Sequence, residues 1–250
     1  MADQKKKRRW VSLSLRTFLL LITLIAVWLG WLIPRAQQQK KVADWIVTFG
    51  RTPYYNYQYD ANGKYSKNRK SPVPNFLADT VSVDYFSSIR MVHLDNKPLG
   101  DISMLSSLAH LRHCELSECE ITDLSPVAEL KNLELLSVSH NPISDLSPIE
   151  YLKQLKHLSI FDTDITDISV IEKLPKLESL YLINNENTDL SPLTNHPSLE
   201  TIDISHSEIN NIAPLKTITT LKSLNVEGTR VPKEQIEELK QTLPGCKVTE

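Results

Sequence analysis

The sequence predicts an α/β fold. We expect a right-handed repeat solenoid with parallel strands on its concave face, short 3₁₀ or irregular helices on its convex side and an N-terminal transmembrane helix. Two observations lead to this prediction. A ten-residue phrase, ITDLSPVAEL at 121–130, returns as ISDLSPIEYL at 143–152 and ITDISVIEKL at 165–174, and an apolar run occupies residues 11–33. The first indicates one repeated structural unit, and the second places a membrane anchor before it.

The start of the chain has the composition of an anchor. Nine of the 28 lysine and arginine residues lie in residues 1–41, against one of the 30 acidic residues. We expect residues 1–10 to form a cytoplasmic basic tail, because the larger cluster of positive charge stays inside. Residues 11–33 would form the transmembrane helix, since 23 helical residues reach about 35 Å. From Pro34 onward the chain would be extracytoplasmic or periplasmic, with the anchor in the inner (cytoplasmic) membrane.

A cleaved signal peptide is the alternative to this anchor. The apolar run is long for a signal peptide. Cleavage after Ala36 would also place Pro34 where a small residue is preferred. We therefore favour an uncleaved anchor.

Residues 34–88 are expected to form a linker helix and an N-terminal capping module. Apolar residues recur at helical spacing over 36–49. The segments YYNYQY at 54–59 and DTVSVDYF at 79–86 predict strands, with a turn at residues 62–63. The alternate tyrosines of the first segment are compatible with ligand binding. We favour a cap, because a stack of repeats has an open apolar end that must be covered.

Residues 89–231 contain seven units of 22 residues. The units open with the pattern L-x-x-L-x-L-x-x-N or close variants of it, which is the leucine-rich repeat signature. We expect positions one, four and six of each unit to point inward and to build a continuous apolar column. The first residues of the units are Ile89, Leu111, Leu133, Leu155, Leu177, Leu199 and Leu221.

The repeated phrase predicts the return from one strand to the next. Leu124, Val127 and Leu130 are three residues apart, which suits a short 3₁₀ or irregular helix. Ser125 is expected to cap this helix and Pro126 to occupy its first position, where a missing N–H does no harm.

The phrase also places an aspartate at one position of five units. Such a carboxylate can accept hydrogen bonds from nearby backbone N–H groups in an Asx-turn. Stacked carboxylates can instead bind calcium. We favour the Asx-turn and expect no metal site. The aspartates are Asp101, Asp123, Asp145, Asp167 and Asp189.

The ninth position of each unit is the place for an asparagine that bonds backbone groups between coils. Asn141 and Asn185 occupy it in two units, and Lys97 in the first unit marks a degenerate edge repeat. Cys114 and Cys119 fall at inward positions, where free cysteine behaves as a small core residue. Three cysteines in all do not make a disulfide framework.

Residues 232–250 are expected to close the array with a polar cap. Pro232 opens a helix whose Ile236 and Leu239 face the core. Residues 246–248 would then add an edge strand.

These repeats resemble the 22-residue leucine-rich repeats of bacterial internalin-type proteins over about residues 89–231. The layout of the whole chain, with QQQKKVADWIVTFGRTPYYNYQYD after the anchor and LKQTLPGCKV after the repeats, is similar to membrane-anchored leucine-rich repeat proteins frequent in planctomycete bacteria. The resemblance implies an interaction module that faces the cell surface or the periplasm. It does not carry over internalin ligands, because the repeats are too few to assume a host receptor.

No catalytic motif is recognisable in the sequence. The seven histidines are scattered through the chain, without a phosphate loop or an HExxH motif. A basic head on an acidic body argues against nucleic acid as the partner of the body. We therefore expect no enzyme activity, no cofactor and no nucleic-acid binding.

The concave face carries the candidate protein-binding site. At positions three, five and seven of the units, which face solvent, most residues are polar. Apolar and aromatic exceptions fall on three adjacent units, and such groups within a polar rim mark interaction sites. Isolated surface residues are the alternative. The predicted patch consists of Leu135, His157, Phe161, Tyr181 and Ile183.

From these features we expect a membrane-anchored module that binds another protein or a cell-envelope polymer through its concave face. One alternative is a structural envelope component whose array packs laterally with its neighbours. Another is a non-catalytic accessory subunit of a membrane enzyme. High abundance in the cell would favour the first alternative, and gene neighbours would reveal the second.

Overall fold

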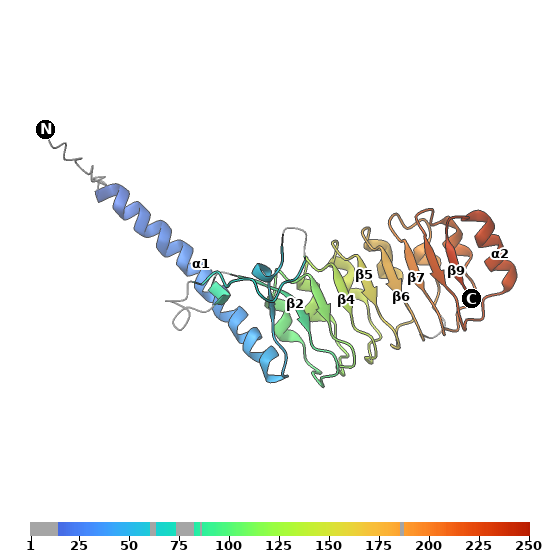
Figure 1. The fold of residues 1–250 in the computed structure, drawn as a ribbon, viewed down its shortest axis with the longest axis horizontal. Helices are drawn as coiled ribbons and strands as arrows, with labels where there is room; N and C mark the ends of the chain where they lie inside the picture. Colours follow the sequence, from blue (N-terminus) through green and yellow to red (C-terminus); the bar gives the residue numbers. More distant parts are fainter. Residues whose placement is uncertain (1–14, 61–63, 74–82, 86, 186–187) are drawn as a thin grey trace.

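The computed structural model describes residues 15–60, 64–73, 83–85, 87–185 and 188–250. Within these residues a nine-stranded sheet runs along the molecule in the order of the sequence (Figure 1). Strands β1 and β2 are antiparallel, and each later pair is parallel. The strands are β1 Tyr54–Tyr55, β2 Ile89–His93, β3 His113–Glu115, β4 Leu135–Ser137, β5 His157–Ser159, β6 Ser179–Tyr181, β7 Thr201–Asp203, β8 Ser223–Asn225 and β9 Lys247–Thr249.

The 22-residue register predicted from the leucines is confirmed. Leu136 faces Leu158 across the β4–β5 pair, and the same offset relates every neighbouring pair from β2 to β8. Positions one, four and six of all seven units are at most 4% exposed. These side chains form one continuous core, because each coil buries its apolar edge only against the next coil.

The return segments are 3₁₀ helices, as the spacing of three predicts. Leu124, Val127 and Leu130 are buried at 1% exposure or less, and equivalent residues fill the same columns in the neighbouring units. The helices are η4 Ser103–Ser107, η5 Ser125–Glu129, η6 Ser147–Tyr151, η7 Ser169–Lys173, η8 Ser191–Leu193 and η9 Ala213–Thr217.

The expected capping role of Ser125 is wrong. Ser125 is the first residue of η5, Leu124 is its N-cap, and no side-chain bond caps the helix. Asp123 instead accepts a hydrogen bond from the Ser125 amide at Oδ1, at 2.8 Å. Hydrogen bonds from the Ser125 side chain and amide hold the pKa of Asp123 below its usual value. The other four aspartates of the column bond the amide two residues on at 2.7–2.9 Å, so Asx-turns account for the column.

A column of left-handed residues follows the strands at position eight. His140 has φ 55° and Asp162 has φ 54°. This conformation turns the chain while keeping the ladder intact, because the His140 amide still donates to the Phe161 carbonyl at 2.7 Å. The whole column is Asn96, Glu118, His140, Asp162, Asn184, His206 and Gly228.

Helix α1, Leu15–Thr48, joins the two segments that the sequence separated into an anchor and a linker helix (Figure 1). Pro34 lies inside the helix without ending it. The first part of α1 projects from the repeats with exposed apolar side chains, whereas Val42 and Ile46 are buried in the common core. The predicted basic tail and the first four residues of the predicted span lie outside the described residues.

Within the described part of the chain, α1 is the one helix long and apolar enough to cross a membrane. A signal sequence near an N-terminus meets the same criterion. Gln39 fixes the helix to the repeats, because its side chain donates to the Ser87 carbonyl at 2.7 Å and accepts from the Ile89 amide at 3.2 Å.

The tyrosine-rich segment 54–59 is not the strand that its alternation predicts. Only Tyr54–Tyr55 pair with β2, and a 3₁₀ helix, η1 Asn56–Gln58, follows at once. The Gln58 side chain accepts a hydrogen bond from the Tyr55 amide at 2.8 Å, so a local bond takes a group that a longer strand would use. The Tyr55 ring is buried and its hydroxyl donates to Asp84 at 3.0 Å.

The predicted strand over 79–86 is also wrong where the structure describes it. Residues Val83–Tyr85 form a 3₁₀ helix, η3, that packs against α1. The remainder of this segment and the predicted turn at residues 62–63 lie outside the described residues.

The C-terminal cap has the expected form. Helix α2, Lys233–Thr242, begins directly after Pro232 and buries Ile236 and Leu239. Strand β9 then pairs with β8 at the end of the sheet. The apolar end of the last coil is therefore covered.

Candidate interaction surface

The strand face is the side of the sheet formed by positions three, five and seven of the units, the surface predicted to be concave. Neighbouring coils bring equivalent positions together: Leu135 lies beside His157, and Ser159 lies beside Tyr181. Leu135, His157 and Tyr181 line one shallow hollow of about 200 Å³, together with Glu115. The structure therefore unites three of the five predicted patch residues.

The hollow exists because small side chains form part of its lining. Ser137 and Ser159 lie in one row with the much larger Tyr181. Leu136 and Leu158, which also line the hollow, are fully buried. The surrounding aromatic and aliphatic groups are half-buried, so they can contact a ligand while remaining fixed by the sheet.

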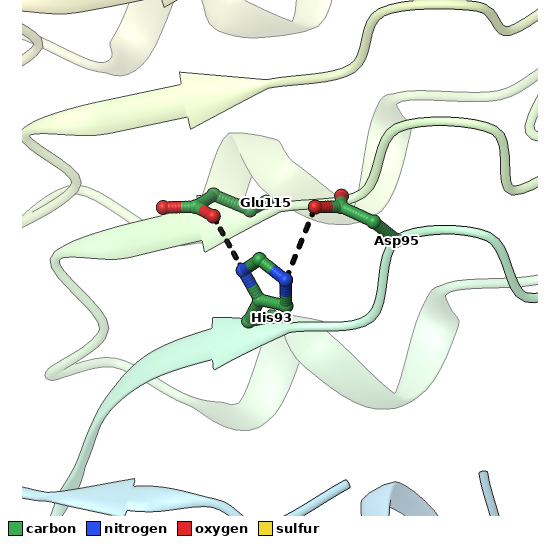
Figure 2. A group of neighbouring side chains, drawn as sticks. All are labelled: His93, Asp95 and Glu115. Carbon is green, nitrogen blue, oxygen red and sulfur yellow. Dashed lines mark hydrogen bonds and ion pairs between the residues drawn. The ribbon is translucent and has the colours of Figure 1, made fainter.

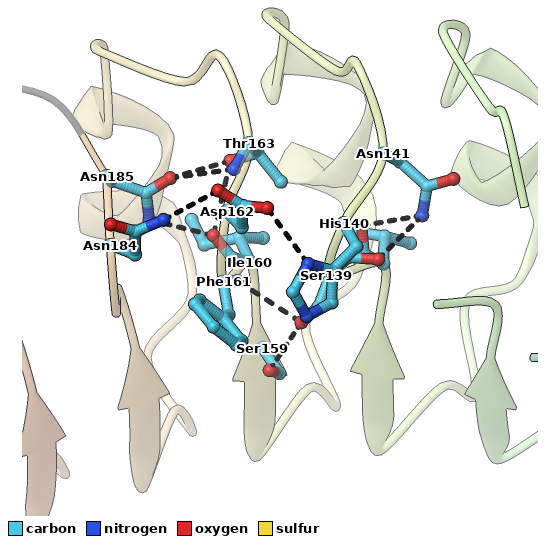
Figure 3. A network of polar contacts seen from close by, with 11 residues as sticks. Ser139, His140, Asn141, Ser159, Ile160, Phe161, Asp162, Thr163, Asn184 and Asn185 are labelled. Atoms are coloured by element: carbon cyan, nitrogen blue, oxygen red, sulfur yellow. Dashed lines mark hydrogen bonds and ion pairs between the residues drawn. The ribbon is translucent and has the colours of Figure 1, made fainter. Parts of the chain in front are cut away.

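Phe161 and Ile183 do not line this hollow. Both stand at position seven, beyond the ends of their strands, and both are half-buried. Phe161 packs edge-on against the His140 ring, with centroids 4.4 Å apart (Figure 3). The predicted patch is therefore divided into a hollow and an adjoining aromatic edge.

Hydrogen bonds along position eight stiffen this edge (Figure 3). His140 Nδ1 lies 2.9 Å from Asp162 Oδ2, and Asn184 Nδ2 donates to Asp162 Oδ1 at 2.7 Å. Beneath them, the Phe161 amide donates to the Ser139 hydroxyl at 3.2 Å. Each bond joins adjacent coils, so the aromatic edge is held by the same register that orders the core.

Charged residues occupy position two, one residue before the position-three side chains that line the hollow. Glu134 forms ion pairs with Arg112 and, at 3.4 Å, with Lys156. Partial burial would raise the pKa of Glu134, but the two cations hold it below its usual value. The position-two row is thus charged and ion-paired, whereas the hollow is lined mainly by apolar and small side chains.

A histidine replaces leucine in one core column of the return segments. His196 is buried, with Nε2 at 3.1 Å from the Leu174 carbonyl and Nδ1 accepting weakly from the Ser198 amide at 3.4 Å. Burial holds the pKa of His196 below its usual value. A neutral ring that donates through Nε2 satisfies both contacts, so His196 acts as a core residue.

Sequence reasoning missed a cluster on the N-terminal side of the hollow, with which it shares Glu115 (Figure 2). His93 and Glu115 face each other at the ends of β2 and β3, and Asp95 follows two residues after His93. One possible ligand atom from each residue lies within 4.8 Å of the others. The 22-residue offset between His93 and Glu115 was a usable signal, because that offset makes two residues neighbours.

A second cavity, of about 670 Å³, lies between α1 and the first coils. Trp31, Arg35 and Gln39 line it from the helix, and His110 and Asn132 line it from the repeats. The Arg35 guanidinium stacks over the Trp31 ring, 3.9 Å from its centroid. This cavity belongs to the junction between the apolar helix and the repeats.

Comparison with known proteins agrees with this architecture. A family model described as "Leucine Rich repeats (2 copies)" matches residues 153–195. The chain carries leucine-rich repeats. No curated protein matches the sequence.

Solved bacterial repeat proteins have a similar fold. An internalin (inlF) from Listeria monocytogenes is 26% identical with a TM-score of 0.60, over 68% of this chain and 52% of the internalin. Internalin C2 (inlC2) from the same species is 29% identical with a TM-score of 0.52, over 55% of this chain and 61% of that one. A leucine-rich repeat protein of Leptospira interrogans is similar in fold, at 19% identity and a TM-score of 0.56, over 65% and 49%. The chain therefore spans about half to three-fifths of the length of these proteins.

Proposed function

We propose that this protein is a non-catalytic binding module that recognises a protein partner through its strand face. The hollow lined by Leu135, His157 and Tyr181 is the observation that carries the proposal. Its walls are largely aliphatic and aromatic, and its backbone is fixed by parallel pairing on both sides. Such a surface can bury an apolar side chain of a partner at a small cost in conformational entropy, because its own backbone is already ordered.

We further propose that the apolar part of α1 anchors the module in a membrane, with the repeats outside the cytoplasm. Residues 15–33 would reach about 28 Å as a helix. Many of their side chains are large, apolar and exposed, among them Phe18, Val27 and Trp31. A lipid bilayer is the environment in which such a surface is stable. The basic tail at residues 1–10 supports a cytoplasmic N-terminus.

Site-directed photo-cross-linking tests the partner surface. A photoreactive phenylalanine analogue is placed at Tyr181 of the full chain, in cells that express the protein natively. Tyr151 is the matched control, because it is a tyrosine on return helix η6, 54% exposed and away from the strand face. We expect a discrete adduct with a protein from position 181 and none of that mass from position 151.

Substitution then tests whether the contact matters for binding. With the captured partner purified, Tyr181→Asp is expected to weaken its affinity at least about tenfold, whereas Tyr151→Asp leaves it unchanged. Adducts from position 151 alone would favour lateral packing of the array and refute recognition by the strand face. Equal affinity of both variants would also refute it.

A further inference from the structure

The geometry points to a binding site for a divalent transition-metal ion, with Zn²⁺ as the fitting probe, on the first coil of the strand face. His93 and Asp95 are its direct ligands, and Glu115 orients the histidine (Figure 2). Imidazole and carboxylate together suit Zn²⁺, whereas calcium and magnesium prefer oxygen ligands alone. This site adjoins the hollow, because Glu115 belongs to both, but its two direct ligands are not part of the lining of the hollow.

Glu115 fixes which nitrogen of His93 is available to a metal. Glu115 Oε2 lies 2.5 Å from His93 Nδ1, which makes Nδ1 the hydrogen-bond donor to the carboxylate. The neutral imidazole then carries its lone pair on Nε2. A carboxylate that accepts from the far nitrogen of a metal-binding histidine is the usual outer-shell partner of such sites.

Asp95 stands at the right distance to share an ion with Nε2. Its Oδ2 lies 3.3 Å from His93 Nε2, longer than the roughly 2.7–2.9 Å of a charge-assisted hydrogen bond. Two ligands about 2.0–2.2 Å from one tetrahedral zinc ion are themselves about 3.3–3.5 Å apart. The Ser117 amide donates to the other oxygen, Oδ1, at 2.7 Å and so keeps Oδ2 turned toward the imidazole.

The cluster is fixed by its backbone and open to solvent. His93 and Glu115 are paired residues of adjacent parallel strands, so their separation is set by the sheet. Side-chain exposure is 37% for His93, 21% for Asp95 and 29% for Glu115, which leaves an approach for an ion. Two protein ligands leave further coordination positions to water or to a group of a second molecule.

Calorimetric titration of the untagged full chain with Zn²⁺ tests the site. We expect one equivalent to bind to the native protein. His93→Gln should abolish this binding, and Asp95→Asn should weaken it more than about tenfold, because each loses a direct ligand. Glu115→Gln should weaken it about 10–100-fold, because an orienting carboxylate is lost.

His140→Gln is the matched control. His140 also pairs with an aspartate on an adjacent coil, with Nδ1 2.9 Å from Asp162 Oδ2. Because His140 is not a ligand of the proposed site, His140→Gln should bind Zn²⁺ as the native protein does. Visible absorption of bound Co²⁺ provides a second readout, which should vanish in His93→Gln and persist in His140→Gln. Circular dichroism of each variant establishes that the repeats remain folded, and Asp95→Asn serves if His93→Gln does not fold.

Two results would overturn the inference. The first is native protein that takes up no Zn²⁺, which would leave His93 as a hydrogen-bonding partner of the two carboxylates alone. The second is uptake that His93→Gln and Asp95→Asn leave unchanged, which would place the ion elsewhere on the protein.

Discussion

Replacing Asn141 by alanine tests whether the ninth-position asparagine joins adjacent coils. Its side-chain oxygen accepts hydrogen bonds from the buried amides of Cys119 and Ile121, at 2.9 and 3.0 Å. Its nitrogen donates to the carbonyls of Leu116 and Val138, both at 2.8 Å, and to the Ser139 carbonyl at 3.0 Å (Figure 3). Alanine would leave two buried N–H groups without a partner. At about 1–3 kcal/mol for each, the loss in free energy of unfolding is roughly 2–6 kcal/mol.

Thermal unfolding of the full chain in detergent, followed by circular dichroism, measures this loss. About 2–4 °C per kcal/mol for a chain of this size gives a fall in Tm of at least about 4 °C. Asn132→Ala is the control, because Asn132 is exposed and makes one bond, to the Ala109 carbonyl at 2.8 Å; a change within about 0.5 kcal/mol is expected. Equal Tm values for Asn141→Ala and Asn132→Ala would refute the reasoning.

Three further predictions follow from buried or strained positions. Burial lowers the pKa of His196, so the unfolded chain binds more protons below about pH 6.5 and folding stability falls as the pH falls. Between about pH 7.5 and 5.5, the Tm of His196→Leu should therefore fall less than the Tm of the native chain. Equal falls in Tm would contradict this. Burial raises the pKa of the Cys114 and Cys119 thiols, so a thiol reagent at neutral pH should modify them only after unfolding, as mass spectrometry would show. Gly228→Ala should destabilise by about 1–2 kcal/mol, because φ is +68° and a Cβ would lie 2.6 Å from His206 Nδ1. In denaturant unfolding, adding His206→Ala to Gly228→Ala should recover only the part of the lost free energy of unfolding that comes from the steric contact with His206.

Much of the strand face was predictable from the spacing of residues. A strict 22-residue period means that residue i and residue i+22 become neighbours, so the pairing of Leu135 with His157 follows from the alignment of the units. Which side chains then share a hollow does not follow, because that depends on rotamers. The Phe161 ring turned to His140 rather than to the hollow at Tyr181.

The capping module was poorly predicted because it is not repeated. Alternating tyrosines at 54–59 have the period of a strand, yet the Gln58 side chain takes the Tyr55 amide and a 3₁₀ helix forms. Pro34 separates two patterns that the structure joins in one helix. Nothing local to either segment specifies these outcomes.

The repeat period, the core columns and the 3₁₀ returns could be predicted from the spacing of residues, because each coil makes the same local contacts and packs only against its neighbours. Leu124, Val127 and Leu130 could be assigned to the core from their spacing alone. The capping module, the split of the patch and the approach of Asp95 to His93 and Glu115 became apparent only from the three-dimensional arrangement. The first two depend on side-chain directions and on contacts that occur once in the chain. The repeat period pairs His93 with Glu115, but it does not direct the Asp95 side chain toward them.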